Sequence, residues 1–193
     1  MLRALYDWTL QKAAHRHAQG WLAAIAFVES SVFPIPPDVL LMPMAFANRE
    51  RAWRYALICT IASVIGGIAG YLIGWLLYDT VGVAILDFYG YREKFEAFAG
   101  LYNQYGFWIV LIAGVTPLPY KVVTIASGAT GLSFPLFMAT SVFARALRFF
   151  VIAALVYWVG PPIRDFIEKR LGLAFTVFVV FLVGGFVAIK YMF

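Results

Sequence analysis

The sequence predicts an all-α integral membrane protein, built as an inverted repeat with two re-entrant hairpins, three full transmembrane helices and interfacial amphipathic helices. Of its 193 residues, 63% are hydrophobic and only 13% are charged, with a mean hydropathy of +0.84. Soluble domains are about half apolar and a quarter charged, so the composition indicates a membrane protein. Long apolar runs alternate with short polar breaks, and two of these runs contain closely spaced prolines.

The N-terminal stretch, residues 1–19, is predicted to be an amphipathic helix lying in the membrane interface. Basic residues and aromatics flank an apolar face, which is typical of such helices. The stretch lacks a continuous apolar core, so a cleavable signal peptide is not expected. The membrane domain follows over residues 20–160, and residues 161–193 form a polar turn and a C-terminal transmembrane helix.

The first predicted repeat, residues 20–78, contains a broken segment and a full span. The apolar run 21–47 is interrupted by prolines, and the run 55–77 is clean and rich in glycine. At ~1.5 Å per residue, 23 helical residues cross a hydrocarbon core of ~30 Å. The glycines are interpreted as a stripe for close helix packing. The prolines of the broken run are Pro34, Pro36, Pro37 and Pro43.

The second predicted repeat, residues 88–160, follows the same order. An acidic, aromatic interfacial helix within 79–105 precedes an apolar segment, 107–131, that Pro117 and Pro119 break. A full span is expected over 134–159 and the last span over 171–189. The motif PIPPDV, residues 34–39, aligns with PLPYKV, residues 117–122, which supports the internal repeat.

Positive charge predicts the orientation of the chain. Basic residues flank the first broken segment on both sides, which places both flanks in the cytoplasm and makes the segment re-entrant. The two halves then have opposite orientations, as in many transporters. The alternative is that residues 21–47 form a kinked transmembrane helix, which would place the basic loop 48–54 outside. The flanking residues are Arg3, Lys12, Arg16, Arg49, Arg51 and Arg54.

Two carboxylates stand within the first broken segment. A proline-broken backbone in lipid is tolerated only where it is buried in protein or lines a wet cavity. Glu29 has no basic neighbour in sequence, and an unpaired carboxylate is disfavoured as an anion in such surroundings. Glu29 and Asp38 are therefore predicted to relay protons or ions, although a neutral or paired Glu29 that fixes helix packing is the alternative.

Three basic residues within the second half are candidates for binding an anionic headgroup. Lys121 occupies the place in its proline motif that Asp38 occupies in the other, which suggests an ion pair between them. Arg145 and Arg148 share one face of the predicted span 134–159. Charges at the centre of a membrane helix cost ~2.5–3.5 kcal/mol each on insertion scales, so they require partners or a wet cavity. The alternative for Arg148 is a structural pair or a side chain that reaches the interface.

Other chemistry is not supported by the sequence. The net charge of +5 belongs to residues at the ends of apolar runs, which fits anionic lipid headgroups and not nucleic acid. His15 and His17 are two residues apart on a predicted helix and point apart, so no metal site is expected. The lone Cys59 is interpreted as a packing residue. No catalytic or cofactor motif is present, so neither an enzyme nor a cofactor is predicted.

The strings ESSVFPIPPD, residues 29–38, and TPLPYKVVTIASG, residues 116–128, together with the arginine-bearing span, resemble the DedA family. These bacterial inner-membrane proteins share the VTT, or SNARE-associated, domain with eukaryotic lipid scramblases. The resemblance covers residues 21–160 and is strongest to the YqaA-like branch. It implies two re-entrant hairpins and the movement of phospholipid or undecaprenyl phosphate, with proton-motive force implicated for some members.

By motif, the resemblance makes Glu29 and Asp38 the family's essential acidic positions and places Lys121 at its second arginine. The first arginine of that family string is absent, since Gly114 or Val115 stands there, and Glu29 and Asp38 are closer than in many members.

The sequence therefore predicts a transporter or scramblase that moves a lipid or lipid carrier across the bacterial inner membrane, with the N-terminus cytoplasmic and with proton coupling as an added expectation. Membrane lipids, or a lipid-linked anion, and protons are the expected partners, and a homo-oligomer is compatible with the sequence. Two other functions stay open: a small-ion or proton antiporter, and a non-transporting scaffold for membrane homeostasis.

Overall fold

The computed structural model describes residues 18–32, 36–116 and 118–159, and these residues contain helices and no strand. The elements are α2 (Ala18–Ser31), α3 (Asp38–Ala47), η1 (Arg49–Arg51), α4 (Ala52–Leu77), η2 (Tyr78–Gly82), α5 (Val83–Tyr89), α6 (Arg92–Val115), α7 (Tyr120–Ala129) and α8 (Phe134–Val159). The predicted interfacial helix 1–19, apart from its last two residues, and the predicted span 171–189 lie outside the described residues.

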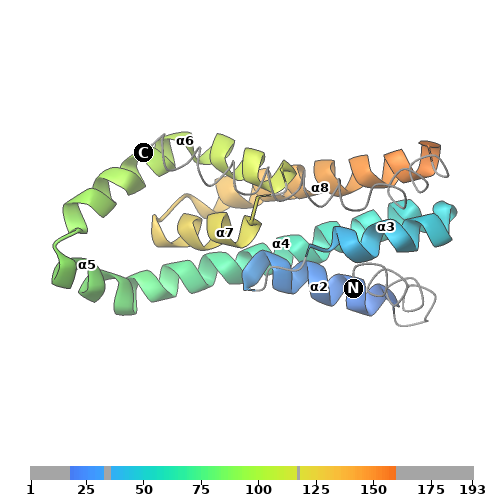
Figure 1. Ribbon diagram of the computed structural model, residues 1–193. Coiled ribbons are helices and arrows are strands. Elements are labelled where there is room, and N and C mark those ends of the chain that lie inside the picture. The colour runs from blue at the N-terminus through green and yellow to red at the C-terminus, as the bar shows by residue number, and fades with distance from the viewer. Residues whose placement is uncertain (1–17, 33–35, 117, 160–193) are drawn as a thin grey trace, which may run out of the picture.

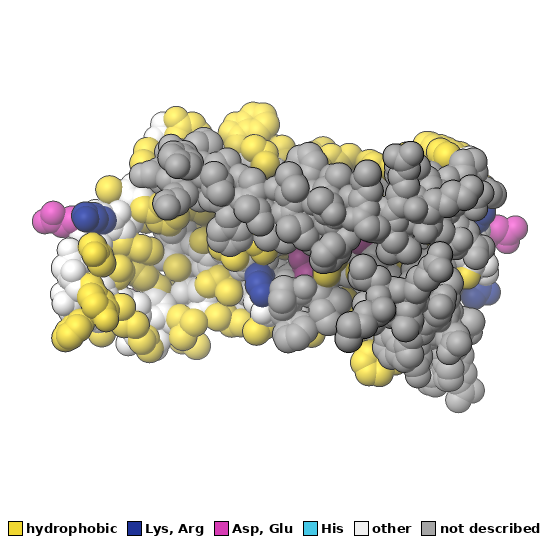
Figure 2. All heavy atoms as spheres, in the orientation of Figure 1, with side chains coloured by type: hydrophobic (Ala, Val, Ile, Leu, Met, Phe, Trp, Pro, Cys, Tyr) yellow, Lys and Arg dark blue, Asp and Glu magenta, His cyan; other side chains and the backbone are white. Residues whose placement is uncertain are grey.

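Three of the described helical stretches are long and apolar enough to cross a membrane: Arg49–Tyr89, Arg92–Val115 and Phe134–Val159. Figure 2 shows charged side chains at both ends of the molecule and a few near its middle, and hydrophobic side chains make up much of the described surface that is visible between them. At one end, Trp53 packs against Phe150, Tyr157 and Trp158. Aromatic side chains beside charges are typical of the membrane interface.

The long helices α4 and α8 pack against each other and run in opposite directions (Figure 1). In the first half, α3 runs back in the direction opposite to α2 (Figure 1). In the second half, α7 likewise runs opposite to α6 (Figure 1). The order of two antiparallel helices followed by a long one thus occurs twice, while the division into repeats 20–78 and 88–160 stays a prediction.

Helix α4 is the central element, because α2, α7 and α8 all pack on it. Its glycines permit the closest of these approaches. A β-carbon at Gly66 would overlap the backbone of Phe27 in α2, and one at Gly74 would overlap the backbone of Ile125 in α7. Small residues that let helix backbones touch are the usual means of packing helices within a membrane. The C-terminal end of α2 and helix α7 are therefore held against the middle of α4.

Prolines stand where the described helices begin or end. Pro37 is the N-cap of α3 and Pro119 that of α7, while α6 ends at Val115 with Thr116 extended. Proline supplies no amide hydrogen, which costs nothing at a helix start, where that hydrogen has no partner. Pro34 and Pro117 lie outside the described residues.

Two expectations from the sequence are wrong. Pro43 does not interrupt the chain but lies inside α3 as its sixth residue, so the helix continues through it although the amide hydrogen bond of that position is lost. The interfacial helix expected to end near residue 105 continues without a break to Val115 as α6. One helical glycine costs only about 1 kcal/mol, so Gly106 does not end the helix, and its missing β-carbon leaves room for the side chain of Leu132.

Candidate functional site: two buried ion pairs

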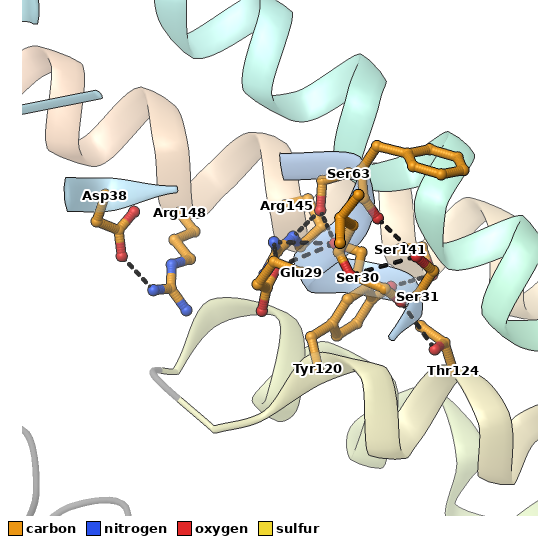
Figure 3. A network of polar contacts seen from close by, with 12 residues as sticks. Glu29, Ser30, Ser31, Asp38, Ser63, Tyr120, Thr124, Ser141, Arg145 and Arg148 are labelled. Carbon is orange, nitrogen blue, oxygen red and sulfur yellow. Dashed lines mark hydrogen bonds and ion pairs between the residues drawn. The ribbon is translucent and has the colours of Figure 1, made fainter. Parts of the chain in front are cut away.

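Arg145 is the centre of a polar network in the interior of the helical bundle (Figure 3). It lies near the middle of α8, and its side chain is 1% exposed. Nη2 donates to Oε2 of Glu29 at 2.6 Å, and Nε donates to Oγ of Ser63 at 2.5 Å. The guanidinium lies 4.7 Å from the ring centroid of Tyr120 and 4.8 Å from that of Phe149. Aromatic faces attract cations, so these rings partly replace the water that burial removes.

Serines complete the surroundings of Glu29, whose side chain is 12% exposed. Ser30 donates to Oε2 of Glu29 at 3.0 Å, and its hydroxyl lies 2.6 Å from that of Ser63. Arg145 Nη2 also reaches Ser30 Oγ at 3.3 Å. Despite these contacts, Arg145 Nη1 is buried without a hydrogen-bond partner among the described residues. The network is therefore rich in polar atoms but not fully satisfied.

A second ion pair joins Arg148 of α8 to Asp38, the first residue of α3. Arg148 Nη2 contacts Asp38 Oδ2, and Nη1 donates to the carbonyl of Thr116 at 2.5 Å, at the end of α6. The Arg148 side chain is 10% exposed and that of Asp38 is 21% exposed, so this pair lies nearer the surface than the first. Arg148 thus links one broken segment to the other.

Lys121 does not pair with Asp38, which corrects the ion pair suggested by the aligned motifs. Its Nζ donates to the carbonyl of Val32 at 3.0 Å, just beyond the end of α2. Thr124, one turn further along α7, donates to the carbonyl of Ser30 at 3.1 Å. Carbonyls in the last turn of a helix have no partner within it and attract cations. Helix α7 therefore caps the C-terminal end of α2.

The structure brings most of the predicted site residues together, but with partners that sequence spacing did not indicate. Glu29, expected to lack a basic neighbour, is paired with a residue 116 positions away. The network also contains Ser63, Tyr120 and Ser141, which the sequence did not single out as polar partners. Tyr120 donates to Ser141 Oγ at 2.5 Å. Position gave a signal for two of them, since Tyr120 directly follows Pro119 and Ser141 precedes Arg145 by one helical turn, whereas Ser63 lies in a clean apolar run and gave none.

A metal site is not indicated within the described ranges, because no three His, Cys, Asp or Glu side chains there could share an ion. His15 and His17 lie outside those ranges. Two carboxylate–arginine pairs instead offer exchangeable charge. A proton on either carboxyl, or a second anion beside either guanidinium, would change which group neutralises the arginine.

Residues 35–158 match the VTT domain. The chain belongs to the VTT-domain, or DedA, family. This match includes α3 to α8 and therefore the Asp38–Arg148 pair, Lys121 and Arg145, whereas Glu29 precedes its first residue. VTT-domain proteins are membrane proteins commonly linked to transport or to membrane homeostasis, and they are not known as enzymes.

Two bacterial relatives align with this VTT-domain protein over most of its length. An uncharacterized protein of Haemophilus influenzae is 37% identical over 167 residues, which is 86% of each chain. An uncharacterized protein of Histophilus somni is 37% identical over 156 residues, or 81% of each chain. No solved structure matches the chain.

Proposed function

We propose that this VTT-domain protein moves a lipid or lipid carrier with an anionic headgroup, such as a phospholipid or undecaprenyl phosphate, across the bilayer and that protons are coupled to this movement. The observation that carries the proposal is the pair of carboxylate–arginine contacts near the middle of the bundle. Charges at such depth are costly and, in membrane proteins, usually mark substrate or ion pathways.

The proposed arrangement in the membrane follows from the paired helices. The segments α2–α3 and α6–α7 are re-entrant and dip in from opposite faces, so that their breaks meet beside the middle of α4. Non-helical backbone at membrane depth is tolerated where protein buries it, and Lys121 and Thr124 satisfy the α2 carbonyls in this way. The N-terminus is cytoplasmic, in the inner membrane, as the basic residues around the first segment favour. The chain is further assigned to the YqaA-like branch, on its ESSVFPIPP and TPLPYK strings.

The proposed headgroup ligands are Lys121, Arg145 and Arg148, and they bind the headgroup one after another. Lys121 and Arg148 are partly exposed, so a headgroup meets them first. Arginine binds phosphate with two parallel hydrogen bonds, which lets a phosphate compete with a carboxylate for the same guanidinium. Arg145 is closed off by Glu29 and its two rings, so it becomes a ligand only after Glu29 leaves it.

Protons act through Glu29 and Asp38 in this mechanism. A protonated carboxyl no longer neutralises its arginine, so protonation favours the binding of another anion at that site. Headgroup binding therefore strengthens when these carboxyls take up protons, and their deprotonation on the other side of the membrane expels the headgroup. The coupling is reciprocal, because a bound phosphate in turn favours the protonated carboxyl.

The test is reconstitution into liposomes with a fluorescent phospholipid whose movement between leaflets is followed. Glu29→Gln, Asp38→Asn and Lys121→Ala are each expected to slow movement at least about tenfold, which corresponds to ~1.4 kcal/mol in the barrier. Arg92→Gln is the matched control, since it breaks an exposed ion pair with Asp87.

Unchanged rates in Glu29→Gln and Lys121→Ala would remove the mechanism. A flux of protons or cations in liposomes that show no lipid movement would instead favour an antiporter. Preserved function in cells for every correctly inserted charge variant would favour a scaffold.

A further inference from the structure

Two adjoining hollows lie along the side of α8 that carries the exposed apolar residues Phe143, Leu147 and Val151. The first has a volume of about 340 Å³ and lies between Phe143 and Ala154; the second has a volume of about 260 Å³ and extends to Val115 at the end of α6. Leu147 and Val151 line both hollows, so the two form one groove that follows the helix. We call it the α8 groove.

Arg148 is the one charged residue among those that line the α8 groove, and all the others are apolar. Its neighbour on the same helix face, Arg145, is almost fully buried and is not among the residues that line the groove. The groove therefore combines apolar walls with a cation at its α6 end. A hydrocarbon chain attached to an anion has this same combination of properties.

We infer that the α8 groove is the seat of an anionic lipid, which enters from the membrane with its phosphate toward Arg148 and one acyl chain along Leu147 and Val151. This inference rests on the proposed function and names the route by which its substrate reaches the ion pairs. When no lipid is bound, the Asp38 carboxylate neutralises Arg148, and the phosphate replaces this carboxylate when the lipid binds. The exchange keeps the arginine neutralised throughout, and a proton taken up by the displaced Asp38 carboxyl leaves that group uncharged as well.

Charge complementarity selects this occupant over the apolar stretch 171–189 and over a second copy packed through α8. The apolar stretch 171–189 contains no Asp or Glu, and so it would offer no counter-ion to Arg148 in exchange for Asp38. The exposed residues of α8 itself are apolar, so a second copy packing through this helix would not supply one either. An anionic lipid brings its own charge, and it is always present in a bacterial membrane.

The experiment places a benzophenone-bearing residue at position 147 of the full chain, in liposomes of equal phosphatidylglycerol and phosphatidylcholine with the same acyl chains. After illumination, mass spectrometry counts the two lipid adducts. Phosphatidylglycerol is expected to be favoured about fivefold, the effect of one basic residue near an anionic lipid. The same probe at position 61, on the exposed face of α4, should label both lipids equally.

Charge variants connect the preference to the arginine. Arg148→Gln should abolish it, and Asp38→Asn should increase it because the competing carboxylate is gone. Equal labelling at positions 147 and 61, or a preference that survives Arg148→Gln, would overturn the inference, as would adducts of position 147 with residues 171–189 or with a second copy.

The outcome also separates the inference from the proposed function. If the protein moves lipid but position 147 shows no headgroup preference, the α8 groove is not the lipid-binding site, while the proposed transport function is retained. A preference that depends on Arg148, without lipid movement, would refute transport and leave the groove as the binding site of a structural lipid.

Discussion

Replacing Glu29 with glutamine is expected to destabilise the protein by about 3–5 kcal/mol, the usual effect of removing one partner of a buried ion pair. Arg145 would keep its positive charge in a buried place, since only 1% of its side chain is exposed to solvent. The remaining contacts, to Ser30, to Ser63 and to the two aromatic rings, carry no negative charge. One guanidinium nitrogen already lacks a hydrogen-bond partner among the described residues.

A double variant separates the charge effect from loss of packing. Arg145→Met keeps an unbranched side chain between Tyr120 and Phe149, and sulfur packs well against aromatic rings. Combined with Glu29→Gln, it leaves no buried charge, so the double variant should be within about 2 kcal/mol of the wild type and more stable than Glu29→Gln alone. Asp38→Asn should cost less than Glu29→Gln, since the Asp38–Arg148 pair is more exposed.

The assay is reversible unfolding in mixed detergent micelles, followed by circular dichroism, for the wild type, both single variants and the double variant. A Glu29→Gln variant within about 1 kcal/mol of the wild type would refute the reasoning, since a surface pair contributes no more than that. So would a double variant as unstable as the sum of its two single changes, because the charges would then not interact.

Three further outcomes are expected. Gly74→Ala should destabilise the protein by about 1–3 kcal/mol, because the added β-carbon would overlap the backbone of α7. Gly100→Ala should be neutral or stabilise it by up to ~1 kcal/mol, because a β-carbon there would meet nothing within 4 Å, and the same unfolding assay compares the two variants. Tyr120→Phe should cost about 1 kcal/mol by loss of its hydrogen bond to Ser141, and a cost below the error of that assay would show the bond to be dispensable. The thiol of Cys59 is fully buried and should react with a maleimide only after denaturation, so labelling of the folded protein would contradict its placement against α2 and α3.

Helix continuity shows the limit of local sequence patterns. The stretch around Gly106 resembled a boundary, because an acidic aromatic run gives way there to an apolar one. The helix nevertheless continues through Gly106, against which Leu132 packs from 26 positions away. Pro43 likewise resembled a break, but α3 continues through it to Ala47.

From the amino-acid sequence alone it followed that the chain is helical and apolar, that helices break near Pro37 and near Pro119, and that the charges within its apolar runs would need partners. These properties follow from hydropathy and from the covalent geometry of proline, both of which are local. Only the tertiary structure decided which charges meet: Glu29 with Arg145, Asp38 with Arg148, and Lys121 with a helix-end carbonyl. The alignment of the two proline motifs paired Asp38 with Lys121 because the two residues have equivalent positions in those motifs. Ion pairs depend instead on which helix faces pack on α4 and α8.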